Sequence, residues 1–185
     1  MLVFRKAALS DAESVAAFVN FAYRGETSRE GWTTEADLLE GLRTNLSDIE
    51  ALILSDDALI ELAFEANELV GSVCVERQGN QASIGMFAVN PRRQGHGIGK
   101  QLLNAAEQAA RQVWGVHRLV MSVITLRHEL IAFYERRGYR RTGVLKPFPV
   151  NPVMWMPKVA GMQLELLEKV LVDDAAKTRV KCATS

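Results

Sequence analysis

The feature that most constrains the fold of this chain is a polar turn with glycines at alternate positions, Gly95, Gly97 and Gly99. The apolar run before the turn ends at Pro91, because proline lacks the donor of a strand ladder and disfavours helical geometry in the residue before it. After the turn, apolar residues recur at helical spacing and predict a long helix over Gly97–Trp114. The chain therefore passes from a strand through a glycine turn into a helix.

Short apolar runs bounded by turn residues predict seven strands along the chain. The last run alternates Met162, Leu164 and Leu166, which favours a strand, although its composition also suits a helix. The predicted strands are, in order, Leu2–Ala7, Ala58–Glu65, Leu69–Arg77, Ala82–Val89, Leu119–Ile124, Tyr139–Val144 and Met162–Leu171.

Capping residues and apolar spacing predict further helices. Ser10 and Glu13 have the spacing of a capping box that opens an amphipathic helix ending near Tyr23, and Ser47 and Glu50 repeat that spacing. The other predicted helices are Thr34–Leu42, Ser47–Leu54 and Arg127–Arg137, the last of which ends at the C-cap glycine Gly138.

The segments between these elements predict one domain with a tail. Arg24–Thr33 has no hydrophobic period and indicates a loop, and Lys146–Pro157 contains four prolines and indicates an irregular excursion. Asp173–Ser185 is charged, small and aperiodic, which predicts a frayed tail. With 185 residues, 48% of them hydrophobic, the chain can bury one substantial core. We expect a single domain over residues 1–172.

The charge balance argues against a polyanionic partner. Lysine plus arginine and aspartate plus glutamate both number 22, so no basic field indicates nucleic acid or an anionic membrane. Cys74 and Cys182 lack the spacing of a zinc site or a disulfide framework, so no metal is expected. Without a signal peptide or a run of about 20 apolar residues, we expect a cytoplasmic protein. The sequence does not determine the oligomeric state, and a homodimer is one of the states that it allows.

The glycine turn has the chemistry of an anion site. The unpaired amides of the first helical turn and the positive end of the helix dipole favour a phosphate, and glycines let it approach the backbone. The alternative is that the glycines only make a tight turn. Two known phosphate motifs fail: a P-loop would need glycine at Gln94 and serine or threonine at Gln101, and a dinucleotide fingerprint would need glycine at Lys100 or Leu102. We therefore expect the turn to bind a pyrophosphate group through a motif of another class.

The turn resembles the Q/R-x-x-G-x-G/A motif of the GNAT acetyltransferase superfamily, here spanning residues 94–99. A second block, Ala132–Tyr139, is similar to the A-x-F-Y-E-K-x-G-F signature of that family, and the flanks of the turn, residues 86–91 and 98–103, are similar as well. The resemblance implies an α/β (α+β) fold, with a mixed, mostly antiparallel central sheet of about seven strands flanked by helices. Its fourth and fifth strands would be parallel and splayed.

The resemblance also implies the donor and its binding residues. In the family, acetyl-coenzyme A pairs its pantetheine arm with the backbone of the fourth strand and its pyrophosphate with the amides of the glycine turn. Arg127 stands where the family often has an asparagine that contacts the cofactor, so this contact stays open. The cofactor-binding residues expected here are Phe87, Ala88, Val89, Gln94, Gly95, His96, Gly97, Ile98, Gly99, Lys100 and Arg127.

The implied reaction is transfer of the acetyl group to an amine in a ternary complex. Tyr134 is the family's usual general acid, which would protonate the departing thiolate; a tyrosine that merely packs is the alternative. The fourth strand lacks the glutamate that many relatives use as a base; Glu76 on the neighbouring strand, or Glu26 and Glu30 in the loop after the first helix, are substitutes. The loop after the first helix forms one side of the acceptor site in the family. The expected substrate contacts are Tyr23, Arg24 and Trp32.

Two rival functions stay open. One is a module that binds acyl-coenzyme A as a sensor without turnover, against which Tyr134 argues. The other is transfer of a different acyl group, since Gly85 or Met86 would open or close the space near the thioester. The acceptor expected from the neutral charge and the mixed charges of the loop is a small amine or an amino-acid-like molecule.

Overall fold

The computed structural model describes residues 1–171, and the tail expected at Asp173–Ser185 lies outside them. A seven-stranded sheet has the order β1-β3-β4-β5-β6-β9-β7, and only its β5–β6 pair is parallel. The fold class expected from the resemblance is confirmed. Strand bounds are β1 Leu2–Lys6, β3 Ala58–Glu65, β4 Glu68–Gln78, β5 Gln81–Val89, β6 Arg118–Ile124, β7 Arg140–Pro147 and β9 Gln163–Val170, with β2 Leu39–Gly41 and β8 Trp155–Pro157 forming a separate pair.

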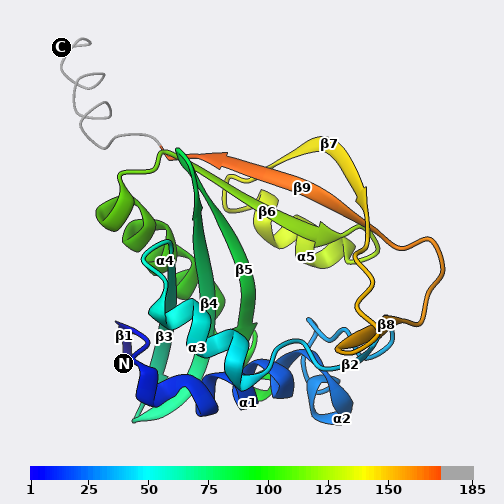
Figure 1. Cartoon of the computed structure of the whole chain (residues 1–185), viewed down its shortest axis with the longest axis horizontal. Helices are drawn as coiled ribbons and strands as arrows, with labels where there is room; N and C mark the ends of the chain where they lie inside the picture. The colour runs from blue at the N-terminus through cyan, green and yellow to red at the C-terminus, as the bar shows by residue number, and fades with distance from the viewer. Residues whose placement is uncertain (172–185) are drawn as a thin grey trace.

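Helices cover both faces of the sheet (Figure 1). The alternation of Leu59 and Ile60 along β3 shows the division, because Leu59 packs with α4 and α5 and Ile60 with α1 and α3. No helix within residues 1–171 is long and apolar enough to span a bilayer. Helix bounds are α1 Ala12–Tyr23, α2 Gly25–Ser28, α3 Leu46–Leu54, α4 Ile98–Trp114 and α5 His128–Glu135, with 3-10 turns at Leu9–Asp11 and Pro91–Arg93.

The parallel strands β5 and β6 begin side by side and then run apart (Figure 1). In the described chain they pair only over residues 81–83 and 118–120. Along β5 the register against β4 shifts, since Ser72 faces Ala88 while Cys74 faces Gly85, which gives β5 one extra residue. Met86 in this bulge has a φ of 43°. A bulge bends its strand, and this one accompanies the departure of the second half of β5 from β6.

Both predicted capping boxes are wrong, although the helices they introduce exist. Before α1 the chain makes a 3-10 turn, and Asp11 Oδ2 accepts a hydrogen bond from the Ala8 amide at 2.7 Å. At α3 the cap is Asn45, whose Oδ1 accepts from the Asp48 amide at 2.8 Å. A side chain therefore caps the first turn of α3, whereas the Asp11 side chain closes the 3-10 turn before α1 and leaves α1 without a side-chain cap.

The helix predicted at Thr34–Leu42 is wrong, because turns followed by β2 occupy this segment. The irregular excursion predicted at Lys146–Pro157 is wrong at both ends, since β7 continues to Pro147 and β8 pairs with β2. Gly41 has a φ of 92°, and a Cβ on it would collide with Met154 O. This pairing joins segments more than 100 residues apart, which local patterns do not show. The strand predicted at Met162–Leu171 is confirmed as β9.

Replacing Gly71 with alanine should destabilise the fold. A Cβ on Gly71 in β4 would lie 2.8 Å from Leu102 Cδ2 and 3.3 Å from Ala63 Cβ, and both side chains are fully buried. Overpacking of this kind costs about 1–3 kcal/mol. The matched control is Gly85→Ala, since no described atom lies within 4 Å of a Cβ there. Urea unfolding should show the loss for Gly71→Ala only, and equal midpoints for the two variants would contradict this packing of α4 on the sheet.

Candidate functional site

Two adjoining cavities lie where β5 leaves β6. The first, of about 240 Å³, is lined by the end of β5, the glycine turn and α5, and the second, of about 340 Å³, by β5, β6 and the segments that follow α1. Four residues, Tyr23, Phe87, Arg127 and Leu130, line both cavities. A ligand in one cavity would therefore meet a ligand in the other at these four residues.

The glycine turn delivers the N-terminus of α4 to the first cavity. Gly95 and Gly97 have φ values of 85° and 80°, which favour glycine. Gly97 is the N-cap of α4, and in the described chain no side chain caps the helix. A Cβ on Gly99 would lie 3.4 Å from Phe133 Cζ, which is an ordinary van der Waals contact. The first-turn amides and the helix dipole together favour an anion there.

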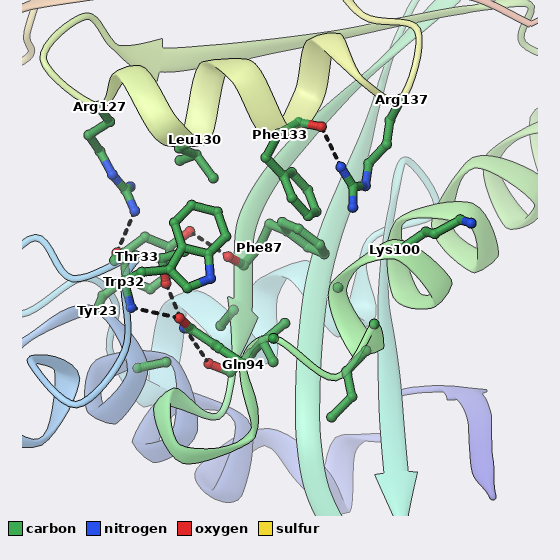
Figure 2. Close-up of a pocket in the computed structure, with 17 residues that line it drawn as sticks. Tyr23, Trp32, Thr33, Phe87, Gln94, Lys100, Arg127, Leu130, Phe133 and Arg137 are labelled. Atoms are coloured by element: carbon green, nitrogen blue, oxygen red, sulfur yellow. Dashed lines mark hydrogen bonds between the residues drawn. The ribbon is translucent and has the colours of Figure 1, made fainter.

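Gln94 joins the glycine turn to the loop that follows α1 (Figure 2). Its Oε1 accepts from the Trp32 amide at 2.9 Å, and its Nε2 donates to Thr33 Oγ1 at 2.7 Å and to Val89 O at 3.3 Å. The Trp32 ring lies 5.9 Å from the Phe133 ring, centroid to centroid. The glutamine side chain therefore fixes the loop that closes one side of the first cavity.

The first cavity is positively charged. Lys100, Arg127 and Arg137 line it, and no described aspartate or glutamate does. Figure 2 shows Arg127 at one end and Lys100 and Arg137 at the other. The Arg137 guanidinium lies 3.3 Å from the centroid of the Phe133 ring and donates to Phe133 O at 2.6 Å. Cations at both ends of the cavity, two of them near the start of α4, suit an elongated polyanion.

Tyr134 is buried in an aromatic cluster and lines the second cavity. Its ring lies 6.2 Å from that of Phe87, 5.3 Å from that of Phe133 and 5.9 Å from that of Tyr139. Within residues 1–171 its hydroxyl makes no hydrogen bond. Burial raises the pKa of Tyr134 above its usual range, and neighbouring Tyr23 and Glu35 act in the same direction against Arg127 and Arg137. The phenol therefore keeps its proton at neutral pH and has it available to donate.

A buried charge cluster of Arg24, Glu35 and Arg127 lines the second cavity. Arg24 is 8% exposed and Glu35 6%. Arg24 Nη1 donates to Glu35 Oε2, Arg127 Nη1 donates to Glu35 Oε1 at 2.7 Å, and Arg127 Nη2 donates to Thr33 O. The cluster ties the loop after α1 to the start of α5. Sequence reasoning missed Glu35, which carries no local signal because it lies in the segment interpreted as a helix.

The structure gathers most of the expected cofactor residues around the first cavity. His96 is the exception, since it is exposed, does not line the cavity and places Nδ1 3.0 Å from Gln94 O. Arg127 lines both cavities, with its guanidinium bound to Glu35 and Thr33. The remaining expected residues that line the first cavity are Phe87, Ala88, Val89, Gln94, Gly95, Gly97, Ile98, Gly99 and Lys100.

The expected acceptor residues are divided between the cavities. Tyr23 lines both and Arg24 the second, whereas Trp32 lines the first only, because Gln94 holds its backbone beside the glycine turn. Glu76 lines the second cavity. Glu26 lines neither, because the short helix α2 leaves its side chain 91% exposed, 3.2 Å from Arg29 Nε. The structure thus brings Glu76, and not Glu26, to the cavity that holds Tyr134.

Neither a cysteine nor a metal cluster is present at this site in the described chain. Cys74 lines neither cavity, and burial raises the pKa of its thiol to about 12. Within residues 1–171 no three side chains of histidine, cysteine, aspartate or glutamate come together as metal ligands would. Among the groups that line the two cavities are backbone amides, guanidiniums, the Lys100 ammonium, the protonated phenol of Tyr134 and the carboxylates of Glu35 and Glu76.

Known proteins share this sequence pattern and this fold. The sequence model of the Acetyltransferase (GNAT) family matches residues 12–139, and no curated protein sequence matches the chain. Among solved structures, an N-acetyltransferase from Staphylococcus aureus Mu50 has a TM-score of 0.71 at 16% identity, over 94% of this chain and 99% of that chain. The PaiA N-acetyltransferase of Thermoplasma acidophilum, in complex with coenzyme A, has 0.63 at 19% identity, over 92% and 99%. YncA of Salmonella typhimurium, with its cofactor acetyl-CoA, has 0.68 at 18% identity, over 94% and 95%. At these identities the structural likeness shows the fold alone.

Replacing Glu35 with alanine should destabilise the protein strongly. The change would leave Arg24 and Arg127 buried without their shared carboxylate, and breaking a buried ion pair in this way costs about 3–5 kcal/mol. Urea unfolding measures the loss. Glu30→Ala is the control, because Glu30 pairs with Arg92 on the surface and should leave the midpoint nearly unchanged. If both variants unfold at the wild-type midpoint, the cluster does not hold this region together.

Proposed function

The chain belongs to the GNAT acetyltransferase family, and we propose that it transfers the acetyl group of acetyl-coenzyme A to the amine of a small or amino-acid-like acceptor by direct attack in a ternary complex. The observation that carries the proposal is the pair of adjoining cavities. One is cationic and begins at a helix N-terminus, the other contains a protonated tyrosine and a carboxylate, and they share four lining residues. Two substrates bound side by side would need such an arrangement.

The first cavity fits the donor. The amides at the start of α4 and in the glycine turn would hold the pyrophosphate, and the backbone of residues 87–89, where β5 has left β6, would pair with the pantetheine arm. A third hollow, of about 480 Å³, shares Lys100 and Arg137 with the first cavity and adds Arg136 and Lys169. The cations of this hollow would suit the third phosphate of coenzyme A. Its one carboxylate, Glu107, accepts hydrogen bonds from Lys169 and Tyr139, so its charge is already partly neutralised.

The residues of the second cavity supply the proton transfers. Acetyl-coenzyme A supplies a thioester, whose acyl carbon forms a bond to the acceptor nitrogen while its carbon–sulfur bond breaks. Tyr134 would donate its proton to the departing sulfur, because burial keeps the phenol protonated. Glu76 would accept the proton that the amine loses, directly or through water. Glu35 suits this role less, because arginines already bond both of its oxygens.

The acyl group itself is set by the space near the bulge of β5. Gly85 and Met86 line the second cavity, and no described atom lies within 4 Å of a Cβ built on Gly85. We propose acetyl as the transferred group. A longer acyl chain is the alternative, because the space beside Gly85 is open. Acyl-coenzyme A donors of increasing chain length would show which the cavity prefers.

Acetyl-coenzyme A should raise the melting temperature of the protein, because a ligand that binds only the native state stabilises it by mass action. Gly99→Asp should abolish this rise, since its carboxylate would repel the pyrophosphate. The variant itself should stay folded, because Gly99 has an ordinary φ and an acidic residue suits the first turn of a helix. Gly99→Asn, of nearly equal size and without charge, is the control and should retain more of the rise. A wild-type rise in the aspartate variant would remove the glycine turn from the proposed site.

Tyr134→Phe should slow acetyl transfer by roughly 10²-fold, with acetyl-coenzyme A affinity nearly unchanged, because only the hydroxyl is removed. Release of free thiol, measured with and without a panel of amines, gives the rate. Since burial raises the pKa of Tyr134, the wild-type rate should show no fall attributable to this phenol up to about pH 10, the usual pKa of tyrosine. Thiol release that no amine accelerates would contradict the proposed function, and a phenylalanine variant with wild-type turnover would make Tyr134 structural.

A further inference from the structure

The second cavity carries more positive charge than its own carboxylates neutralise. Three arginines line it, Arg24, Arg43 and Arg127, against two glutamates, Glu35 and Glu76. Both oxygens of Glu35 are already taken, one by Arg24 and one by Arg127. A guanidinium has five N–H donors, so a single shared carboxylate leaves donors of this cluster unused.

Arg24 shows most clearly that this cluster has more hydrogen-bond donors than acceptors. Its side chain is 7% exposed, and its Nε is buried with no hydrogen-bond partner in the described chain. A buried donor of a charged group without a partner is costly. Such a donor beside a cavity is expected where a bound molecule supplies the missing acceptor.

Arg43 supplies a second unpaired cation. Its side chain is half-buried, and its guanidinium lies 5.6 Å from the centroid of the Tyr23 ring. Its guanidinium forms no ion pair and no hydrogen bond with any residue from 1 to 171. Its backbone amide donates a hydrogen bond to Asn20 Oδ1 at 2.7 Å. Arg24, Arg43 and Arg127 line the second cavity together with Tyr23. Tyr23 in turn donates its hydroxyl to Phe87 O at 3.1 Å, beside the first cavity.

The rest of the second cavity suits a compact molecule with an amine and an apolar side chain. Glu76 forms no ion pair within the described residues and is available to an ammonium group. Met121, Phe148 and Trp155 add apolar surface. A volume of about 340 Å³ is at the small end of ligand pockets.

We infer that the acceptor carries a carboxylate next to its amine, and that Arg24 and Arg43 bind this carboxylate in the second cavity. The acceptor class is therefore a free amino acid. This inference rests on the proposed function, and it narrows the acceptor from any small amine to one that supplies the anion missing from the arginine cluster. An α-amine at a protein N-terminus would lack that carboxylate and leave the donors of Arg24 and Arg43 unpaired.

The test uses matched acceptors with the wild-type protein and acetyl-coenzyme A. Thiol release is measured with the twenty amino acids, and then with the best amino acid, its amide and its decarboxylated amine. The three share one side chain and one amine and differ in the carboxylate. Because charge-assisted pairs with arginine are strong, kcat/KM should be at least about 10²-fold higher for the amino acid than for the other two. Equal or better kcat/KM for the amide or the amine would overturn the inference and leave the proposed function intact.

Arg43→Gln separates binding of the carboxylate from the fold. Arg43 is in no ion pair with a described residue, so its removal leaves no described carboxylate without its cation, unlike removal of Arg24. KM for the amino acid should rise about tenfold or more, while the constants for the decarboxylated amine should stay near wild type. Arg118→Gln is the control, because Arg118 is exposed, pairs with Glu168 and lines neither cavity. An equal effect of Arg43→Gln on both acceptors would overturn the role of Arg43.

No transfer to any amine would instead contradict the proposed function, and the inference would fall with it. Binding of acetyl-coenzyme A, followed by the melting temperature in the same samples, shows that the protein used is intact. The two failures are therefore distinct, one seen as transfer without preference for a carboxylate and the other as no transfer at all.

Discussion

The site depends on the separation of two parallel strands in the middle of the sheet. β5 and β6 pair over only three residues of each in the described chain, and the extra residue near Met86 bends β5 away. A continuous sheet would satisfy these backbone groups internally and leave no room between the strands. The divergence instead produces two cavities that adjoin at Tyr23 and Phe87. The glycine turn lines the first of these cavities, and Tyr134 and Glu76 line the second.

The second organising element is the buried cluster around Glu35. Two arginines from distant parts of the chain share one carboxylate, so the loop after α1 and the start of α5 are held together. A buried ion pair of this kind is weak evidence for stability, because desolvation offsets much of the attraction. Its value here is geometric, since it fixes the boundary of both cavities. The same cluster leaves guanidinium donors for a ligand, which connects the fold to the choice of acceptor.

Local patterns predicted the central elements well and the peripheral ones poorly. The helix at Gly97–Trp114 and the strands around it were recognised because their period and their stop signals lie within a few residues. The local pattern at Thr34–Leu42 predicts a helix wrongly, because the partner strand of this region, Trp155–Pro157, is far away in the sequence. The role of Glu35 depends on Arg24 and on Arg127, 92 residues later, so no local pattern contains it. Most of the cofactor residues could be predicted, since they follow one another along the glycine turn.

The most direct test of the central claim is amide hydrogen exchange, residue by residue, with and without acetyl-coenzyme A. If the donor lies in the opening between β5 and β6, exchange should slow at residues 87–89 and at the amides of residues 95–100. Residues 2–6 of the edge strand β1, on the far side of the sheet, should be unchanged. Unchanged exchange at the end of β5 and in the glycine turn, under conditions that saturate the protein with acetyl-coenzyme A, would contradict the account.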